Sequence, residues 1–232
     1  MKIYIEGEKI RGTFQKRVNR FIAEVKVGSQ LVVVHVANTG RMKELLTPGA
    51  EVLLRRVNEP HRKTNYDLLM VYHKGILVSI DSKLPNRLLY QGFINKEIVA
   101  FDKFNEVKRE VTYGKSRLDL ALINEEKELV LIEAKCVTLV KEGELASFPD
   151  APTERGTRHV RELTEAVKQN IRGAVFFIVQ REDAVRFTPN KEMDPQFQQA
   201  VTEAKKAGVE FYAYNCIVTE DYIAINDELE IF

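Results

Sequence analysis

The sequence predicts an α/β protein (α+β overall) in two parts: an OB-like β-barrel over residues 1–82 and a mixed-sheet α/β domain over residues 83–232. Three observations predict this division. The first eighty residues contain short alternating or β-branched apolar runs, which are typical of strands. The later residues alternate between helical and strand patterns. The sign of the net charge also changes between the two parts.

The N-terminal part is predicted from its strands. RFIAEVKV alternates apolar and polar residues, SQLVVVHV is rich in β-branched residues, and AEVLLRRV follows a Thr-Pro-Gly turn at residues 47–49. YDLLMVYHKGILVSI contains two more strands with a turn at Lys74-Gly75. About five short strands and one helical turn near Met42–Leu46 suit an OB barrel, although another small barrel would give the same pattern.

The C-terminal part is predicted to follow the order αβββαβαβ. A helix begins at Pro85-Asn86, and the strands EVKREVTY, SRLDLALI and ELVLIEAK follow it. A second helix, from about Thr157 to Ile171, carries apolar side chains on one face. GAVFFIVQ is a buried strand, Asp194-Pro195 begins a third helix that ends at Gly208, and VEFYAYNCIV is the last core strand. This order predicts a mixed sheet flanked by helices.

Composition restricts the class of protein. Hydrophobic residues make up 44% and charged residues 30% of the 232 residues, as expected of a folded globular protein. No apolar run has the length of a membrane span, and MKIYIEGEKIRG lacks the core of an export signal. We therefore expect a cytoplasmic protein without a membrane partner. Cys136 and Cys216 match no metal-ligand spacing and are expected to be reduced thiols.

The distribution of charge is more informative than its sum. The chain has a net charge of +1, but residues 1–90 hold 16 Lys/Arg and 8 Asp/Glu, whereas residues 91–232 hold 19 and 26. A basic surface for a polyanion beside an acidic site for a cation would produce this asymmetry. Two solvated faces that differ by chance would produce it as well.

One Glu-x-Lys tripeptide differs in context from the others. The chain contains the pattern five times, beginning at Glu24, Glu106, Glu125, Glu133 and Glu203. Only Glu133 and Lys135 directly follow a run of four large apolar residues. Side chains two apart on a strand point to one face, about 6.6 Å apart. A carboxylate at the end of a buried strand is costly unless a cation or metal pairs with it.

Two turn lengths align further acids with Glu133. A two-residue Gly114-Lys115 turn of type II′ sets Glu110 opposite Asp119, and a three-residue loop at 125–127 sets Asp119 opposite Glu133. The register is decisive, because a slip of one residue turns every side chain to the other face. The sequence thus predicts a row of three carboxylates with Lys135 beside it.

Like charges in a row call for a cation between them. Mg²⁺ or Mn²⁺ held by Asp119, Glu133 and Glu110 fits that need, and Lys135 would orient water or stabilise phosphoryl charge during phosphodiester cleavage. These four residues are the predicted catalytic set. The alternative is a structural ion network among the acids, Lys135 and Arg117.

Longer strings carry a resemblance to a known family. An acid on one strand of a meander followed by Glu-x-Lys on the next resembles the PD-(D/E)XK nuclease superfamily. HVANTGRM, EVTYGKSRLDLAL, LIEAKCVTL and FPDAPTERGTRHVREL together resemble the sugar fermentation stimulation protein A (SfsA) family over nearly the whole chain. The resemblance implies an OB-like domain, a nuclease-like domain and DNA binding, with a regulatory link to sugar metabolism.

The resemblance places Asp119, Glu133 and Lys135 at the nuclease-type positions and makes Glu110 a candidate additional acid. Two departures stand out. The chain reads His-Val-Ala-Asn at residues 35–38, where family members commonly read His-Cys-Pro-Asn, so no cysteine acts there. The superfamily's Pro-Asp is also absent, since Leu118 precedes Asp119.

Basic and aromatic residues supply the candidate nucleic-acid contacts. Arg155 and His159 lie near the start of the second helix, where an anion such as a scissile phosphate is favoured; a capping network around Thr157 is the alternative. The aromatic residues Phe14, Phe21 and Tyr66 are candidates for stacking on bases, or for filling the barrel. His35 is expected to be a hydrogen-bonded core residue. The predicted nucleic-acid contacts are Arg17, Arg20, Arg41, Arg62, Lys63 and Arg155.

Three functions remain open at this point. The first is a DNA-binding protein with an Mg²⁺-dependent nuclease activity. The second is a DNA-binding regulator of sugar metabolism genes that keeps the site without turnover. The third is an OB-containing protein that binds another protein, which the basic N-terminal part makes less favoured.

Overall fold

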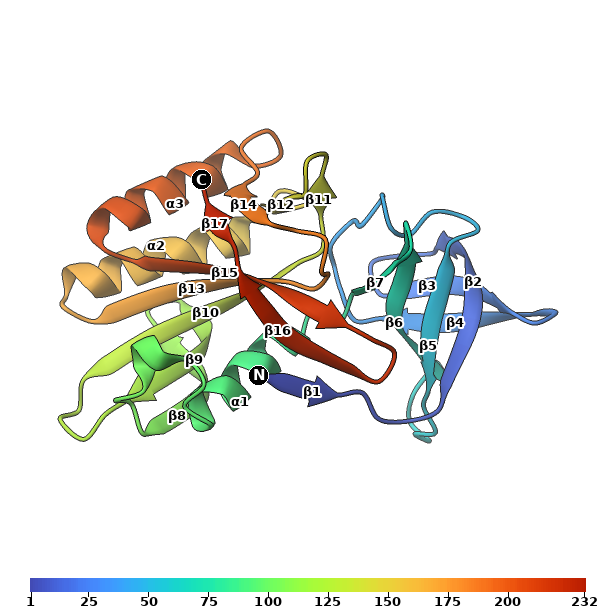
Figure 1. Ribbon diagram of the computed structural model, residues 1–232, viewed down its shortest axis with the longest axis horizontal. Helices are drawn as coiled ribbons and strands as arrows, with labels where there is room; N and C mark the ends of the chain where they lie inside the picture. Colours follow the sequence, from blue (N-terminus) through green and yellow to red (C-terminus); the bar gives the residue numbers. More distant parts are fainter.

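The computed structural model describes residues 1–232 as a β-barrel lying beside a larger layered domain (Figure 1). In the barrel the strand order is β4-β3-β2-β5-β6-β7. A parallel pairing of β4 with β6, at His35 with Asp67 and Val36 with Leu68, closes five of these strands into a barrel. The strands are β2 (Lys9–Arg17), β3 (Ile22–Val27), β4 (Gln30–Val36), β5 (Glu51–Arg56), β6 (Tyr66–His73) and β7 (Ile76–Ser79). The predicted OB-like barrel is confirmed.

The larger domain is built on a seven-stranded mixed sheet in the order β1-β16-β15-β13-β10-β9-β8. Its strands are β1 (Lys2–Tyr4), β8 (Glu106–Tyr113), β9 (Ser116–Ile123), β10 (Leu129–Val137), β13 (Arg172–Val179), β15 (Glu210–Val218) and β16 (Tyr222–Glu228). A small second sheet lies at one end and contains β11 (Val140–Lys141), β12 (Leu145–Phe148), β14 (Arg186–Pro189) and β17 (Glu230–Ile231). The predicted mixed sheet is therefore confirmed.

Helices cover both faces of the large sheet (Figure 1). α1 (Leu84–Ile94) packs on one face through Leu88, Leu89 and Phe93. α2 (Glu154–Lys168) and α3 (Pro195–Ala207) pack on the other. A short 3-10 helix, η1, spans Val99–Phe101. None of the helices has the length and apolarity needed to cross a membrane.

The ends of the helices follow from local capping. α2 begins three residues earlier than predicted because the Thr153 hydroxyl accepts the backbone N–H of Gly156. α3 begins and ends as predicted: the Asp194 carboxylate accepts the N–H of Phe197, and Gly208 ends the helix in a left-handed conformation with φ of 101°.

The first strand belongs to the large sheet, although the sequence analysis grouped residues 1–82 together. β1 pairs antiparallel with β16, with Ile3 opposite Ile223, and Ile3 is buried in the core beneath α1. Three residues are too few to show a period in the sequence, so tertiary packing decides where they pair. The chain therefore starts in the larger domain and returns to it after the barrel (Figure 1).

The strand registers follow the predicted turns. Tyr113 lies opposite Ser116 across the Gly114-Lys115 turn, where Gly114 has φ of 56° as a type II′ turn requires. Ile123 lies opposite Leu129 across the next loop. Pairing of β9 with β10 ends at Leu120 and Ile132, while β10 continues to Val137 beside β13. The sheet therefore splits between β9 and β10 just before Asp119 and Glu133.

Buried polar contacts fix the barrel against the larger domain. The Gln180 side chain, fully buried after β13, donates to the carbonyl oxygens of Ser79 and Asp81, each at 3.1 Å. Asn38 donates to Sγ of Cys136, on β10, at 3.7 Å. The apolar core beneath α1 also includes Leu53 of the barrel. Because the connection is both apolar and hydrogen-bonded, the groove between the two parts has a defined shape.

Candidate functional site

The split sheet positions a buried acid, an amine and an imidazole together. Glu133 is 3% exposed on β10, and its Oε1 atom accepts a hydrogen bond from Lys135 Nζ at 2.5 Å. Nδ1 of His159, on α2, lies 2.5 Å from the same oxygen. Arg155 Nε donates to the other ring nitrogen of His159 at 3.4 Å, so Nδ1 carries the proton that points at Glu133.

The second oxygen of Glu133 has no partner. Oε2 is buried and accepts no hydrogen bond from the protein. Burial acts to raise the pKa of Glu133, but Lys135 and His159 together lower it below its usual value. The group is therefore an ionised carboxylate with one free acceptor oxygen, which is the state that a cation ligand needs.

Asp119 lies at the split, where each of its carboxylate oxygens accepts a hydrogen bond and keeps a second lone pair. Oδ2 accepts the backbone N–H of Ala134 at 2.8 Å. This side-chain bond stands where β9 and β10 no longer form backbone hydrogen bonds with each other. Oδ1 accepts from Nδ2 of Asn86, on α1, at 3.0 Å. Burial and the nearby Glu133 charge raise the pKa of Asp119. Mutual repulsion between the two carboxylates is thus built into the site, and a cation would relieve it.

Glu110 is directed away from Asp119 and Glu133. Its side chain is 58% exposed and forms an ion pair with Arg117. The backbone at Glu110 is left-handed, with φ of 56°, and the strand changes face there: Val107 packs beneath α1, whereas Val111 packs on the α2 side. Strict alternation, on which the predicted row of three acids depends, is interrupted at this point. No group of three or more His, Cys, Asp or Glu residues is arranged as a ready metal shell.

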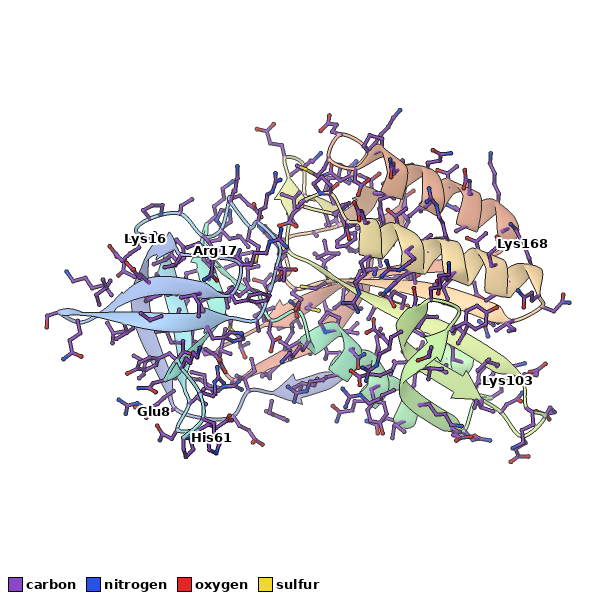
Figure 2. The ribbon with its side chains drawn as sticks, turned by 180° about the vertical axis from the view of Figure 1, so that it is seen from behind. Glu8, Lys16, Arg17, His61, Lys103 and Lys168 are labelled. Atoms are coloured by element: carbon purple, nitrogen blue, oxygen red, sulfur yellow. The ribbon has the colours of Figure 1, made fainter.

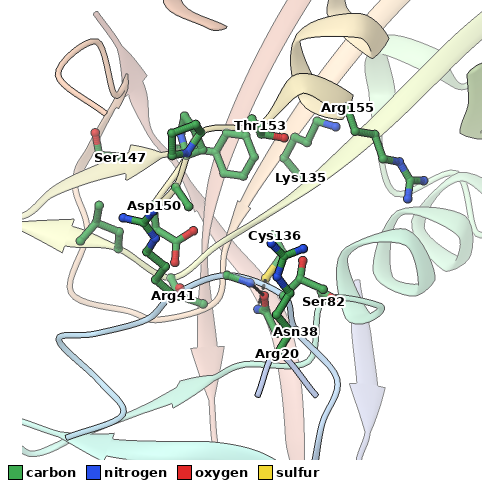
Figure 3. Close-up of a pocket in the computed structure, with 18 of the residues that line it drawn as sticks. Arg20, Asn38, Arg41, Ser82, Lys135, Cys136, Ser147, Asp150, Thr153 and Arg155 are labelled. Atoms are coloured by element: carbon green, nitrogen blue, oxygen red, sulfur yellow. Dashed lines mark hydrogen bonds between the residues drawn. The ribbon is translucent and has the colours of Figure 1, made fainter. Parts of the chain in front are cut away.

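A cleft of about 900 Å³ between the barrel and the larger domain contains the split. Asp119, Glu133 and Lys135 line one wall, and the barrel loop from Asn38 to Arg41 lines the other. Figure 3 shows Lys135 and Arg155 on one side of this space and Arg20, Asn38 and Arg41 on the opposite side. We call it the interdomain cleft. Six of its lining residues are basic: Arg17, Arg20, Arg41, Lys43, Lys135 and Arg155.

The predicted nucleic-acid residues divide into three groups. Arg20, Arg41 and Arg155 are exposed, form no ion pair and line the interdomain cleft. Arg17 also reaches the cleft, but its guanidinium donates to the carbonyl oxygens of residues 19, 20, 38 and 40 and so holds the barrel loops together. Figure 2 shows Arg17 on the barrel, remote from Lys103 and Lys168 at the far end of the larger domain.

Arg62 and Lys63 lie elsewhere. They line a second cavity of about 530 Å³, which we call the barrel pocket. Arg62 is ion-paired with the buried Asp67, which also accepts from Arg55 at 2.7 Å. His35 lies there too, with Nδ1 3.3 Å from Asp67 and its side chain 32% exposed. His35 is therefore hydrogen-bonded, as predicted, but it lies at the surface of the barrel and not in its core.

Asp150 connects the larger domain to the barrel loop in the cleft. Its Oδ2 accepts the backbone N–H of Met42 at 2.9 Å. A Cβ atom at Gly40 would lie only 2.9 Å from the same oxygen, so the close approach of this loop requires glycine. The Pro-Asp pair at 149–150 thus positions the cleft wall.

His159 differs from the phosphate-contacting role that the sequence suggested, whereas Phe14 takes the barrel-filling role that was one of its two alternatives. His159 is 1% exposed and contacts Glu133, so it does not face the cleft where a phosphate would lie. Phe14 is 1% exposed and fills the barrel, while Phe21 is 51% exposed. Asn86, which holds Asp119, was not identified in advance. No local pattern marks it, because its role arises from the packing of α1 on the sheet.

Comparisons with known proteins divide the chain into the same two parts as the structure. The family model described as the SfsA N-terminal OB domain matches residues 16–80, and the sugar fermentation stimulation protein RE domain matches residues 83–222. The sugar fermentation stimulation protein homolog of Clostridium tetani is 46% identical over 221 residues, covering 95% of this chain and 96% of the relative. That of Clostridium botulinum strain Langeland is 44% identical over 222 residues, or 96% of each chain.

A solved structure matches the whole chain. The structure of Pyrococcus furiosus SfsA in complex with Ca²⁺ superposes with a TM-score of 0.91 at 29% identity and covers 100% of this chain and 99% of that one. The OB barrel, the endonuclease-like domain and the full-length sequence matches agree. The chain belongs to the sugar fermentation stimulation protein (SfsA) family.

Proposed function

We propose that the protein binds DNA in the interdomain cleft, holds a divalent cation at Asp119 and Glu133, and hydrolyses phosphodiester bonds there. One observation carries the proposal. Both domains contribute cations to a single cleft, and that cleft also contains the buried carboxylate of Glu133, the half-buried carboxylate of Asp119 and a lysine. Basic residues around buried acids suit a polyanion that is held against a metal.

The residues of the split fit a divalent cation. The buried Oε2 of Glu133 has no hydrogen-bond partner and is available to a cation. Burial, and after it the charge of Glu133, raise the pKa of Asp119, and a bound cation would counteract both effects. Two carboxylates leave the remaining positions to water and phosphate oxygens, which is how Mg²⁺ is usually bound. The Pyrococcus furiosus relative, solved in complex with Ca²⁺, supports a divalent-cation site; Mg²⁺ or Mn²⁺ is our proposal for activity.

Each residue has a distinct task in this proposal. Asp119 and Glu133 hold the cation, which would polarise a phosphoryl oxygen and acidify a bound water. Lys135 moves from Glu133 toward the phosphate and stabilises the charge that develops on it. His159 keeps Glu133 ionised and oriented through its Nδ1–H donor. Arg20, Arg41 and Arg155 bind backbone phosphates. Glu110 remains a candidate only if the strand around it rearranges, because Arg117 now pairs with it.

A second function is favoured by one specific contact. Lys135 and His159 both engage the same oxygen of Glu133, so the acid is already neutralised without a cation. An acid whose charge is already neutralised supports DNA binding without turnover, as in a regulator of sugar metabolism genes. The two functions share the cleft and differ only in whether cleavage occurs.

The test combines cation binding with a nucleic-acid panel. Calorimetric titration with Mg²⁺, Mn²⁺ or Ca²⁺ is expected to show one site in the wild type and none in Glu133→Gln. The matched control is Glu125→Gln, which alters another Glu-x-Lys tripeptide in an exposed loop and should bind the cation normally. Single- and double-stranded DNA and RNA are then tested for binding and cleavage with each cation.

The outcomes separate the two functions. Cleavage by the wild type that is lost in Lys135→Ala, with cation and DNA binding retained, would establish hydrolysis. Salt-sensitive DNA binding without cleavage under any cation would establish the regulator. Cleavage that persists in both Glu133→Gln and Lys135→Ala would contradict the assignment of the site.

A further inference from the structure

The barrel pocket lies directly across a narrow ridge from the interdomain cleft. Ala37 lines the barrel pocket and Asn38 the cleft; Ser82 lines the cleft, while Asp81 and Lys83 line the barrel pocket. The ridge is a fixed crossing of two chain segments, because both the hydroxyl and the N–H of Ser82 donate to the carbonyl oxygen of Ala37, at 2.6 and 3.1 Å. The two cavities are thus adjacent and separated by backbone.

The barrel pocket has more cations than its acids can neutralise. Five Lys or Arg residues and His35 line it, against two acids, Asp67 and Asp81. Asp67 is 6% exposed and takes up Arg55 and Arg62, whose hydrogen bonds outweigh the effect of burial and lower its pKa to about 2. Asp81 accepts the backbone N–H of Lys83.

Three of these cations have no acidic partner. Lys63, Lys83 and Arg87 are exposed, and none of them forms an ion pair. They come from the barrel, the connector and α1, so they converge on the pocket from both domains. The pocket volume of about 530 Å³ is in the range of sites that hold a nucleotide-sized group. Unpaired cations around a cavity of that size suit a phosphate group of a polyanion.

We infer that the barrel pocket is a second phosphate-backbone subsite for the nucleic acid whose scissile bond lies in the interdomain cleft. A polynucleotide would cross the ridge of Ala37 and Ser82 and place further phosphates against Lys63, Lys83 and Arg87. The preferred ligand is therefore a strand or duplex long enough to occupy both cavities, and a short oligonucleotide fills only the cleft. This inference rests on the proposed function and extends it to the length of the ligand.

The test compares two triple variants with equal change in charge. Lys63→Ala/Lys83→Ala/Arg87→Ala removes the subsite cations. The control, Lys26→Ala/Lys127→Ala/Lys206→Ala, removes three exposed and unpaired cations that line neither cavity. Binding of a length series of oligonucleotides, single-stranded and duplex, is measured by fluorescence anisotropy at several salt concentrations. Circular dichroism verifies that both variants are folded.

We expect the subsite variant to weaken binding of long ligands and leave short ones unaffected. The slope of log binding constant against log salt concentration is negative. Each lost phosphate contact makes it shallower by about 0.9 on duplex DNA, so the loss of three contacts makes it shallower by roughly 2.7. The control variant should keep the wild-type slope.

Other outcomes would overturn the inference. The pocket would be no separate subsite if the two triple variants showed the same salt dependence of binding on long ligands. The same conclusion would follow if the subsite variant lost as much affinity for short ligands as for long ones. Both results leave cleavage and cation binding in the cleft untouched. If the wild type binds no nucleic acid of any length, the proposed function fails and this inference fails with it.

Discussion

Two buried carboxylates in this protein are paired in opposite ways. Asp67 in the barrel is 8% exposed at its side chain, and both of its oxygens accept from guanidinium groups. Glu133 in the large sheet is 4% exposed at its side chain, but both of its partners meet one oxygen and the other has none. A buried acid that is fully paired holds a fold together, whereas a half-paired one retains capacity for a ligand.

The largest expected effect is a stability gap between isosteric variants of the two acids. Asp67→Asn leaves two guanidiniums facing each other without a counter-charge, and should lower the free energy of unfolding by about 3 kcal/mol. Glu133→Gln removes one carboxylate near Lys135, but Asp119 remains as a nearby counter-charge and the repulsion between the two acids is lost. Its cost should therefore be smaller, about 1 kcal/mol. Urea denaturation of both variants without cations measures the gap. A larger loss in Glu133→Gln would reverse our assignment of the two roles.

The contribution of Asp67 to the free energy of unfolding should depend on pH. The folded pKa of Asp67 is about 2, below its ordinary value of 3.8. Its contribution is therefore complete above pH 4 and declines as the pH falls toward 2, because the unfolded state then binds the proton more readily. The difference in unfolding free energy between wild type and Asp67→Asn should narrow over that interval. A difference that stays constant from pH 5 to pH 2 would contradict this.

Substitution of Asn86 should weaken cation affinity and leave the fold intact. Asn86→Ala removes the donor that orients Asp119, and loss of such an outer partner typically weakens metal affinity 10- to 100-fold. Calorimetric titration with Ca²⁺ or Mn²⁺ measures the change. Asn95→Ala is the matched control: it follows the same helix and lies away from the cleft. Wild-type affinity in Asn86→Ala would exclude this positioning role.

The smallest effect is expected at His159. His159→Leu removes the Nδ1–H donor to Glu133 and should cost about 1 kcal/mol of stability. His159→Asn places an amide donor near the Nδ1 position and should recover part of that loss. Thermal unfolding of both variants, with cation affinity as a second readout, provides the test. Equal behaviour of the two would show that the hydrogen bond is unimportant.

Local signals were enough to predict much of the fold. The Gly-Lys turn fixed the pairing of β8 with β9, and Asp194 and Gly208 marked both ends of α3. These features depend on residues close in sequence, where turn and cap chemistry act directly. The motifs that resemble the SfsA family predicted that an OB barrel is joined to an endonuclease-like domain, and the comparisons confirm this.

Long-range packing determined what local signals could not. The left-handed backbone at Glu110 turned that acid to solvent, and three residues at the N-terminus joined the far edge of the large sheet. Arg62 was assigned to the same nucleic-acid surface as Arg20, yet Asp67 captures it in another cavity. Charge alone does not reveal which cations are already paired.

The two-part architecture and the position of Glu133 and Lys135 at the end of a buried strand could be read from local patterns in the sequence. The reason is that periodicity and turn residues encode local pairing. Only the tertiary structure decided that β9 leaves β10 at Asp119, that Asn86 and His159 reach the acids from opposite helices, and that the barrel loop forms the second wall of the cleft. These contacts join residues far apart in the chain, and packing of the two domains brings them together.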